Sequence, residues 1–447
     1  MDFLKEDFNI ETLSSLSDEE LCELLDSDHA IDIAEIVEDM NDEELLTFIK
    51  RLSYNQLAFV VEQSSIESSL KILNNLDDRA ILQVFSHMSK DDIVDILGDM
   101  KIARQKSLIN LMKKSDQEVI RTLLSYKEDS AGGIMTTEYC VVKAHLSIQK
   151  AIDKLKEIAP KTEVIDTIFV TDNKNELIGI VNLRDILVTP YSNSIADIMD
   201  TDLIYVHPED DQEEVSLLVS KYDLKAMPVV NHKKQLIGII TIDDIIDVIV
   251  EEHNEDMMRM AGVSSEEDIE TPIISSIKLR LPWLLVNLVT AFIAAFTVSI
   301  FSDVITKVVA LAAINPIIAG MGGNAGAQEL SIIIRSITMG EAELKDSLPL
   351  IYKQFVIGLV NGLIIGLITG GIMAIFYKNI YLLIIILLAM IINLILAGVS
   401  GLIIPLTLKA LKIDPALASS IFLTTVTDVC GFFAFLGLAQ LFIHKLI

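Results

Sequence analysis

Cysteine, histidine and basic residues are scarce in this chain of 447 residues. The three cysteines, Cys22, Cys140 and Cys430, are too far apart for a disulfide framework or a zinc motif, which is typical of a protein in the reducing cytosol. No two histidines have the spacing of a metal site. Only 35 Lys and Arg stand against 64 Asp and Glu, and binding nucleic-acid phosphates requires clustered positive charge. We therefore expect no nucleic-acid partner.

Sequence motifs of common enzymes are also missing. The chain has no Walker-type phosphate loop, no nucleophile elbow and no His-rich zinc motif. The first ten residues include Asp and Glu where a secretory signal needs a basic and then an apolar run. We expect a protein that is not an enzyme, with its amino terminus in the cytoplasm.

Charge and apolar residues are distributed unequally along the chain. Residues 1–270 contain 57 acidic and 25 basic side chains, whereas residues 271–447 contain 7 and 10. The later part includes apolar stretches longer than the ~20 residues that cross a bilayer. The sequence thus predicts an acidic, water-facing half followed by a membrane half.

Short amphipathic stretches occupy residues 18–126, with apolar residues three or four apart. Several begin with a capping residue followed by acids, as at 17–20, 41–44 and 89–92, where the helix dipole favours negative charge. This recurrence predicts an all-α domain over residues 1–130, built as a stack of helix pairs.

An internal repeat follows. Residues 169–187 recur as residues 228–246, both containing Leu-Ile-Gly-Ile, and Ile134-Met135-Thr136 is echoed by Ile198-Met199-Asp200. Strand, polar turn, strand and an Asp that opens a helix resemble a tandem pair of CBS (cystathionine-β-synthase-type) domains. We place these α/β domains at 131–196 and 197–253. The resemblance implies ligand sensing rather than catalysis.

Five apolar stretches predict an all-α, five-helix membrane domain over residues 281–447, after a connecting region at 254–280 that begins within an acidic helix from about residue 243. The stretches are Leu281–Phe301, Val308–Ile334, Phe355–Tyr377, Tyr381–Leu408 and Ala416–Ile443. With the amino terminus inside, seven basic residues flank the inner ends and three the outer ends, as the positive-inside rule requires. We expect a multi-pass protein of the cell membrane, in contact with lipid, with cytoplasmic CBS domains and the carboxyl terminus outside.

Asp428 lies inside the fifth predicted span. A carboxylate there costs about 2.5–3.5 kcal/mol unless it faces water or a partner, so Asp428 is expected to line a polar path. We expect Thr424 and Thr427 on the same face as Asp428, about one turn before it, where their hydroxyls could orient water or the carboxylate. The alternative is a purely structural hydrogen bond between helices.

The second predicted span contains a proline and four glycines between Asn315 and Gln328. Such a string indicates either non-helical backbone lining a cavity or tight packing of helices through small residues. Asn324 and Gln328, four residues apart, add oxygens on one face, which packing alone does not require. An oxygen-lined cavity with one carboxylate suits a hard cation, and magnesium keeps several waters when protein holds it.

The order of domains, together with Pro316-x3-Gly320-x-Gly322-Gly323-Asn324-x-Gly326-x-Gln328, Asp414-Pro415-Ala416 and Thr427-Asp428-x2-Gly431, resembles the MgtE family of magnesium channels. The resemblance implies a homodimer with one pore, in which Asp428 holds hydrated Mg²⁺ and Gly322, Gly323, Asn324, Thr424 and Thr427 line the path. Relatives commonly carry a proline where this chain has Ile421, which removes the expected cause of a bend in the fifth span.

The acidic helix before the membrane half stacks Asp244, Asp247, Glu251 and Glu255 along one face, which is either a solvated surface or a site for divalent cations. The family resemblance implies the second, because such channels close when Mg²⁺ fills acidic sites between their cytosolic parts. The matching regulatory positions are Asp91, Asp95, Asp211, Glu213, Asp223, Asp244, Asp247, Glu255 and Asp256.

A nucleotide site is a further implication of the CBS resemblance. Thr241 and Asp244 match the hydroxyl and carboxylate that contact ribose, whereas the first copy keeps Asp185 but has Asn182 in place of the threonine. ATP modulation is implied for some relatives.

From these features we expect a magnesium-selective channel that imports Mg²⁺ and is closed by cytosolic Mg²⁺. One alternative is a broader carrier of divalent cations, including cobalt and manganese. Another, from a different class, is a non-conducting membrane-bound nucleotide sensor that acts through the CBS pair.

Overall fold

The computed structural model describes residues 13, 16, 20, 21, 30–38, 40–159, 162, 164–265, 267–269, 271–340 and 347–446. These residues belong to two compact units, Met1–Val248 and Ile249–Ile447. Most of the predicted helix start at 17–20 lies outside the described residues.

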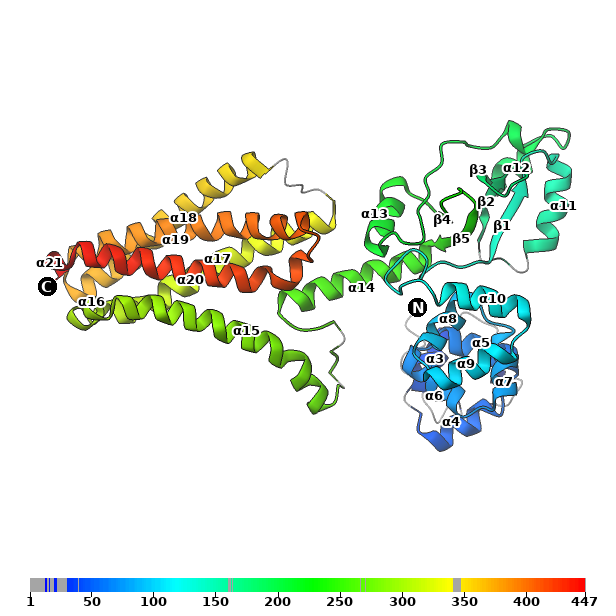
Figure 1. Cartoon of the computed structure of the whole chain (residues 1–447), viewed down its shortest axis with the longest axis horizontal. Helices are drawn as coiled ribbons and strands as arrows, with labels where there is room; N and C mark the ends of the chain where they lie inside the picture. Colours follow the sequence, from blue (N-terminus) through cyan, green and yellow to red (C-terminus); the bar gives the residue numbers. More distant parts are fainter. Residues whose placement is uncertain are drawn as a thin grey trace. The chain divides into compact units, whose positions relative to one another are not determined.

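The amino-terminal part of the first unit is helical (Figure 1, blue to cyan). Contacts join α3 with α5, α5 with α7 and α7 with α9, and also α6 with α8 and α8 with α10, so the predicted stack is confirmed. The helices are α3 (Ala30–Glu38), α4 (Asp42–Ile49), α5 (Tyr54–Glu62), α6 (Ile66–Asn74), α7 (Asp78–Phe85), α8 (Lys90–Gly98), α9 (Ile102–Leu111) and α10 (Lys114–Leu123).

Two of the predicted helix starts can be compared directly. Asn41 forms a capping box with Glu44 at the start of α4, as the sequence predicts. Ser89 also occupies the cap position of α8, but its hydroxyl donates to the carboxylate of Asp92 and caps no backbone N–H. The side-chain cap predicted at Ser89 is therefore wrong, because a neighbouring acid takes the hydroxyl.

The repeat folds as two similar α/β modules. In the first, β1 pairs in parallel with β2, which pairs in antiparallel with β3; in the second, β4 pairs in antiparallel with β5. The strands are β1 (Tyr139–Lys143), β2 (Val164–Thr171), β3 (Leu177–Asn182), β4 (Ala226–Val230) and β5 (Leu236–Thr241). The helices are α11 (Ile148–Ile158), α12 (Leu183–Val188), α13 (Gln212–Tyr222) and α14 (Ile242–Met260), with a 3-10 turn at Ile195–Asp197.

The two modules exchange their leading segments. Thr136, in the leading segment of the first module, pairs with Ile239 of β5, and Asp200, in the leading segment of the second, pairs with Ile180 of β3. The neighbouring methionines reach the same places: a Cβ at Gly238 would lie 2.6 Å from Sδ of Met135, and one at Gly179 would lie 2.8 Å from Sδ of Met199. Each glycine thus lets the other module's segment approach the sheet, which locks the two modules together.

The second unit consists of the last turns of α14 and a bundle of long helices (Figure 1, green to red). Helix α18 packs on α19, α17 packs on α19 and α20, and α15 packs on α20. The helices are α15 (Ile273–Ile300), α16 (Ser302–Lys307), α17 (Ala310–Thr338), α18 (Ser347–Tyr377), α19 (Ile380–Ala410), α20 (Pro415–Leu441) and α21 (Ile443–Leu446). The bundle core gathers buried side chains of α17, α19 and α20, among them Leu311, Ile385 and Phe435.

Four helices of this unit are long and apolar enough to cross a membrane: α15, α18, α19 and α20. Helix α17 is equally long but is not among them; it carries Asn315, Asn324, Gln328 and Glu329. Four of the five predicted spans are therefore found in the described part of the chain, and the crossing of α17 stays a prediction.

Backbone at the glycine-rich string is helical. Helix α17 runs from Ala310 to Thr338 with Pro316 and all four glycines inside it. Of the two interpretations that the sequence left open, non-helical backbone is therefore wrong. In an apolar setting an unbroken helix satisfies its own backbone groups, which favours it over an irregular segment. Helix α20 likewise continues through Ile421, which is buried.

Candidate functional site

Asp428 lies in the middle of α20, within one of the apolar spans, and its side chain is half-buried. Among the described residues, no hydrogen bond or ion pair reaches its carboxylate. A carboxylate in such a helix needs water, a cation or another subunit to be stable. Asp428 is thus a carboxyl group of the second unit for which the described residues supply no partner.

The two threonines predicted beside Asp428 are placed differently from each other. Thr424 is exposed one turn before Asp428, and its hydroxyl donates to the carbonyls of Ser420 and Ile421 at 3.0 and 3.1 Å. Thr427 is completely buried and donates to the carbonyl of Thr424 at 3.1 Å. The prediction that Thr427 shares the face of Asp428 is wrong, because these two residues are adjacent and adjacent helical residues point about 100° apart. Of the two threonines only Thr424 is exposed.

Residues of the glycine string divide into two groups. Gly322 is buried against α19, where an added Cβ would lie 2.4 Å from Nδ2 of Asn393. Gly326 is buried against α20, where an added Cβ would lie 2.8 Å from Cδ1 of Leu423. Gly323 has open space around it, and Asn324 is exposed. The string therefore packs two glycines tightly and leaves its polar side uncovered.

Asn393 of α19 connects the two helices that carry the candidate pore residues. Its side chain is fully buried, and Nδ2 donates to the carbonyl of Ile318 in α17 at 2.8 Å. A Cβ on Gly431 of α20, three residues after Asp428, would lie 2.7 Å from Oδ1 of Asn393. Asn393 thus fills the space between Gly322 and Gly431 and sets the separation of α17 and α20.

A cluster of carboxylates forms in the first unit, where α8 approaches the start of α14. We call it the α8 acidic group. Burial and the neighbouring charge of Asp92 raise the pKa of Asp91 to about 6, and burial and Asp91 together raise that of Asp244 to about 6. The group consists of Glu62, Asp91, Asp92, Asp95, Glu138 and Asp244. It contains three of the predicted regulatory residues: Asp91, Asp95 and Asp244.

Negative charge in this group is poorly balanced. Burial raises the pKa of Glu62 to about 7. Loss of water around Asp95 and the negative charges of Asp91 and Asp92 raise the pKa of Asp95 to about 7, although part of its surface is exposed. Lys90 pairs with Glu138 at 3.5 Å. Thr136 and Ser89 stabilise the Asp91 carboxylate by hydrogen bonds, but its Oδ1 is buried and has no hydrogen-bond partner among the described residues. A cation at this place would lower the free energy of the ionised group.

The described residues offer no ready-made cage for a bare ion, because no three His, Cys, Asp or Glu side chains converge closely enough to hold a metal. The carboxylates of the α8 acidic group repel one another but are too far apart to contact a bare ion together. A hydrated ion, which is larger, would meet both conditions. Magnesium stays hydrated readily, since it loses water reluctantly and is often held by one or two carboxylates.

Of the remaining predicted regulatory residues of the first unit, Asp211 and Asp223 have local roles at the ends of one helix. Asp211 caps α13 by accepting from the N–H of Glu213 at 2.9 Å, and Asp223 ends the same helix with φ of 52°. Asp247 is exposed on α14.

Glu255 and Asp256 belong to the second unit and have protein partners there. Glu255 forms an ion pair with Arg259, and the same guanidinium pairs with Asp414. Asp256 accepts from the hydroxyl of Thr338 at 2.8 Å, and burial raises its pKa above the usual range.

The predicted nucleotide residues form matching pairs in the two modules. In the second, the hydroxyl of Thr241 donates to Asp244 at 2.6 Å; in the first, Nδ2 of Asn182 donates to Asp185 at 3.2 Å. Asp244 therefore belongs both to the candidate nucleotide site and to the α8 acidic group.

Several site residues were missed by reading the sequence. Glu62 ends α5, where the helix dipole disfavours negative charge, and that unfavourable position was a usable signal. Asp92 is adjacent to a predicted residue. Arg259 has a visible partner at Glu255, four residues earlier, but its second partner, Asp414, is 155 residues away and gives no local signal.

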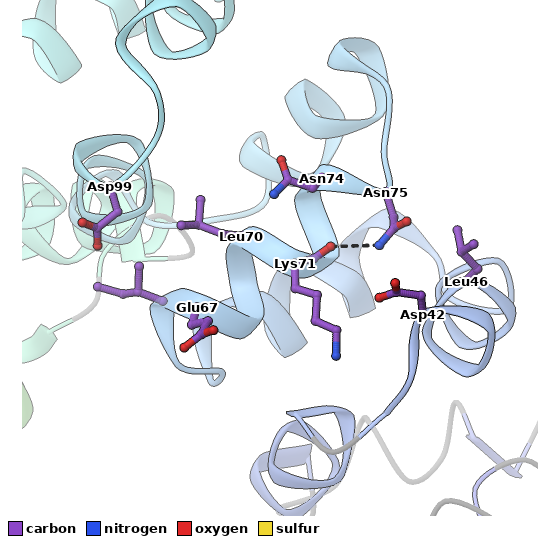
Figure 2. Close-up of a pocket in the computed structure, with 9 residues that line it drawn as sticks. Asp42, Leu46, Glu67, Leu70, Lys71, Asn74, Asn75 and Asp99 are labelled. Atoms are coloured by element: carbon purple, nitrogen blue, oxygen red, sulfur yellow. Dashed lines mark hydrogen bonds between the residues drawn. The ribbon is translucent and has the colours of Figure 1, made fainter. Parts of the chain in front are cut away.

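A surface pocket of about 940 Å³ lies between α4 and α6 (Figure 2). Its lining includes Asp42, Glu67, Lys71 and Asp99. The Nζ of Lys71 donates to the carbonyl of Met40 at 2.6 Å, and Asn75 donates to the carbonyl of Lys71. No residue predicted as a site lines it.

Comparison with known proteins identifies the family. A family model described as a divalent cation transporter, MgtE, matches residues 315–438, one for the MgtE intracellular N domain matches 28–129, and the CBS model matches 131–189 and 195–251. The magnesium transporter MgtE of Bacillus subtilis is 32% identical over 359 residues, which cover 80% of both chains. This chain belongs to the MgtE family. The protein of the same name from Thermus thermophilus is 30% identical over 361 residues, again 80% of both chains.

Solved structures agree for the cytosolic part of this MgtE-family chain. A crystal structure of the soluble part of a magnesium transporter has a TM-score of 0.51 and 30% identity, covering 54% of this chain and 96% of that one. The cytosolic domain of the Mg²⁺ channel MgtE in complex with ATP has a TM-score of 0.50 and 31% identity, covering 53% and 97%. The predicted arrangement of a helical domain followed by a CBS pair is confirmed.

Proposed function

We propose that this MgtE-family chain is a homodimeric, magnesium-selective channel that imports Mg²⁺ across the cytoplasmic membrane and closes when cytosolic Mg²⁺ binds its acidic cytosolic parts. The observation that carries the proposal is Asp428, a half-buried carboxylate in an apolar span with no hydrogen bond or ion pair among the described residues. The magnesium transporters to which the chain is similar support the choice of ion.

A second copy of the chain would complete the pore. Helix α17 exposes a row of small and polar residues that suits a wet path or a partner better than lipid. The row consists of Ala313, Gly320, Asn324, Ala327, Gln328 and Ser331. Two Asp428 carboxylates across a shared path would hold a hydrated dication that neither could hold alone.

Inward movement follows from the membrane potential. A potential that is negative inside favours entry of each charge by about 2.3 kcal/mol per 100 mV, so a dication gains twice that amount. The proposal includes five spans, with α17 among them, and a carboxyl terminus outside.

Closure would use the α8 acidic group. Its carboxylates repel one another when ionised, and Mg²⁺ would stabilise the compact arrangement in which they lie together. A ligand shifts a conformational equilibrium only if it binds one state better. Low cytosolic Mg²⁺ would leave the repulsion in place and favour opening.

Nucleotide binding is a second proposed activity, supported by the relative whose cytosolic domain was solved with ATP. We assign the site to Thr241 and Asp244, because the first module has Asn182 at the place of the threonine. Calorimetry with ATP should show binding that Thr241→Val weakens and Asp185→Asn leaves unchanged. Equal effects of both variants would contradict the assignment.

Recording of single channels tests the main proposal. The parent protein should conduct Mg²⁺ at low cytoplasmic Mg²⁺ and fall silent as Mg²⁺ is raised. Asp428→Asn keeps the shape and removes the charge, so conduction should drop at least tenfold. Asp303→Asn, at an exposed position of α16, is the matched control and should conduct normally.

Other outcomes distinguish the alternatives. Unchanged Mg²⁺ conduction by Asp428→Asn would sink the proposed pore. Equal currents of Co²⁺ or Mn²⁺ through the parent would indicate a broader carrier. A parent that stays electrically silent at low Mg²⁺ but binds ATP would instead indicate a sensor.

A further inference from the structure

In the last turn of α14, the side chain of Arg259 lies between two carboxylates. The guanidinium of Arg259 uses Nη2 to pair with Oε1 of Glu255 and Nη1 to pair with Oδ2 of Asp414. The three side chains are partly exposed, at 34% for Arg259, 21% for Glu255 and 25% for Asp414. All three belong to the second unit.

Asp414 connects this ion-pair group directly to α20. It is the cap residue of that helix, and its other oxygen, Oδ1, accepts from the N–H of Ala416 at 2.7 Å. One carboxylate therefore holds the start of the helix that contains Asp428 and also accepts the charge of Arg259.

Two further contacts fix the same turn of α14. Asp256 accepts a hydrogen bond from Thr338 at the end of α17. Met260 packs against a cluster formed by Leu330 and Ile334 of α17 with Ala416 and Leu423 of α20. The turn that contains Arg259 is thus attached to both helices that carry the candidate pore residues.

An arginine in this position has a consequence that a metal ion would not have. The guanidinium is permanently charged and covalently tethered, so it does not leave when the free cation concentration falls. Two carboxylates that share one cation also form the kind of oxygen pair to which a hydrated divalent cation binds. Arginine and a dication would therefore compete for the same place.

We propose that Arg259 is a resident counter-ion that holds the last turn of α14 on the start of α20 independently of Mg²⁺, and that it occupies a place where Glu255 and Asp414 would otherwise bind a divalent cation. Arg259 is a positioning residue: it acts on the pore through Asp414 and α20. Its effect on conduction rests on the proposed channel function, whereas the attachment itself does not.

Hydrogen–deuterium exchange of the full-length protein in detergent tests the attachment without measuring transport. In the parent, amides of residues 257–263 should be equally protected with 10 mM Mg²⁺ and with EDTA. In Arg259→Gln they should exchange about tenfold faster in EDTA, as expected on losing a charge-assisted contact, and regain protection with Mg²⁺. Arg259→Lys, which keeps the charge, should lie between the two.

The double variant Arg259→Gln/Asp414→Asn separates ion binding from simple packing. It should exchange fast with or without Mg²⁺, because one of the two carboxylates is gone. Amides of residues 385–390 in the core of α19 serve as the folding control and should be unchanged throughout.

Three results would overturn the proposal: an Arg259→Gln variant as well protected in EDTA as the parent, a single variant that Mg²⁺ does not restore, or a double variant that Mg²⁺ does restore. If the exchange follows our expectation but the parent does not conduct Mg²⁺, the channel function fails and the attachment stands.

Discussion

Glu62 is a single residue whose ionised form destabilises the folded protein. It ends α5, accepts from the N–H of Ser89 at 2.9 Å, and lies near Asp91, Asp92 and Glu138. Its pKa, raised to about 7 chiefly by burial, means that the folded protein disfavours the ionised form. At pH 8 Glu62 is ionised and lowers the free energy of unfolding.

Replacing Glu62 by Gln should therefore stabilise the protein at pH 8 without Mg²⁺. The amide oxygen can still accept from Ser89, while the charge is removed. The raised pKa of Glu62 corresponds to about 3 kcal/mol of free energy of unfolding if it is taken in full. Because Glu62 is partly exposed, we expect a gain of roughly 1 kcal/mol. For a unit of this size that is an increase of about 2–4 °C in melting temperature, measurable by calorimetry.

Glu157→Gln is the matched control, since Glu157 also lies in the last turn of its helix, α11, but is exposed. It should change the melting temperature by less than about 1 °C, as surface substitutions usually do. Equal stabilisation by both variants would show that the helix dipole, and not the acidic group, is responsible.

Helix α17 packs closely on α19 and α20 because it has glycine at two of the contact positions, Gly322 and Gly326. Gly322→Ala would place a Cβ 2.4 Å from Nδ2 of Asn393, which is itself fully buried and bonded to Ile318. Overpacking of this kind costs about 1–3 kcal/mol. We expect a lower melting temperature in detergent and reduced Mg²⁺ conduction, because α17 must move away from α19.

Gly371→Ala on α18 provides the comparison, as nothing lies within 4 Å of a Cβ there. Its melting temperature should equal or exceed that of the parent, because Ala favours helix over Gly. A Gly322→Ala variant as stable and as active as Gly371→Ala would mean that Asn393 relaxes and does not set the helix separation.

Local patterns predicted most of the elements, and contacts between distant segments explain the exceptions. The repeat at residues 169–187 and 228–246 fixes strand, turn and strand in each module, because alternation and turn residues act locally. The segments that contain Thr136 and Asp200 were visible as a repeat, but no local pattern shows that each pairs with a strand of the other module. In α17 the same limit left two interpretations open, because local glycine content fits a break as well as tight packing. Only the folded unit shows Gly322 packed on Asn393 and Gly326 on Leu423.

The candidate site follows the same division at the scale of the whole molecule. Asp428 was predictable because a charge inside an apolar stretch is conspicuous wherever it occurs. Asp91, Asp95 and Asp244 were assigned by family resemblance, and the structure brings them into one electrostatic group. The partnership of Arg259 with Asp414 could not be read from the sequence, because only the folded second unit brings these residues together.

Stability of the whole protein should depend on pH and Mg²⁺ together. The pKa values of Glu62, Asp91, Asp95 and Asp244 are raised to about 6 or 7 in the folded state, so between pH 4 and pH 7 the folded protein binds more protons than the unfolded chain. Stability from these groups is therefore present at low pH and is lost as the pH rises through 6 to 7.

Without Mg²⁺ the melting temperature should accordingly be higher at pH 6 than at pH 8. Adding 10 mM Mg²⁺ should raise it by several degrees at pH 8, where the carboxylates are ionised and bind cations, and by less at pH 6, where protons already occupy part of the group. Calorimetry of the full-length protein at both pH values measures this. Equal stabilisation by Mg²⁺ at pH 6 and pH 8 would contradict a regulatory role for the α8 acidic group, because binding would then not require its ionised carboxylates.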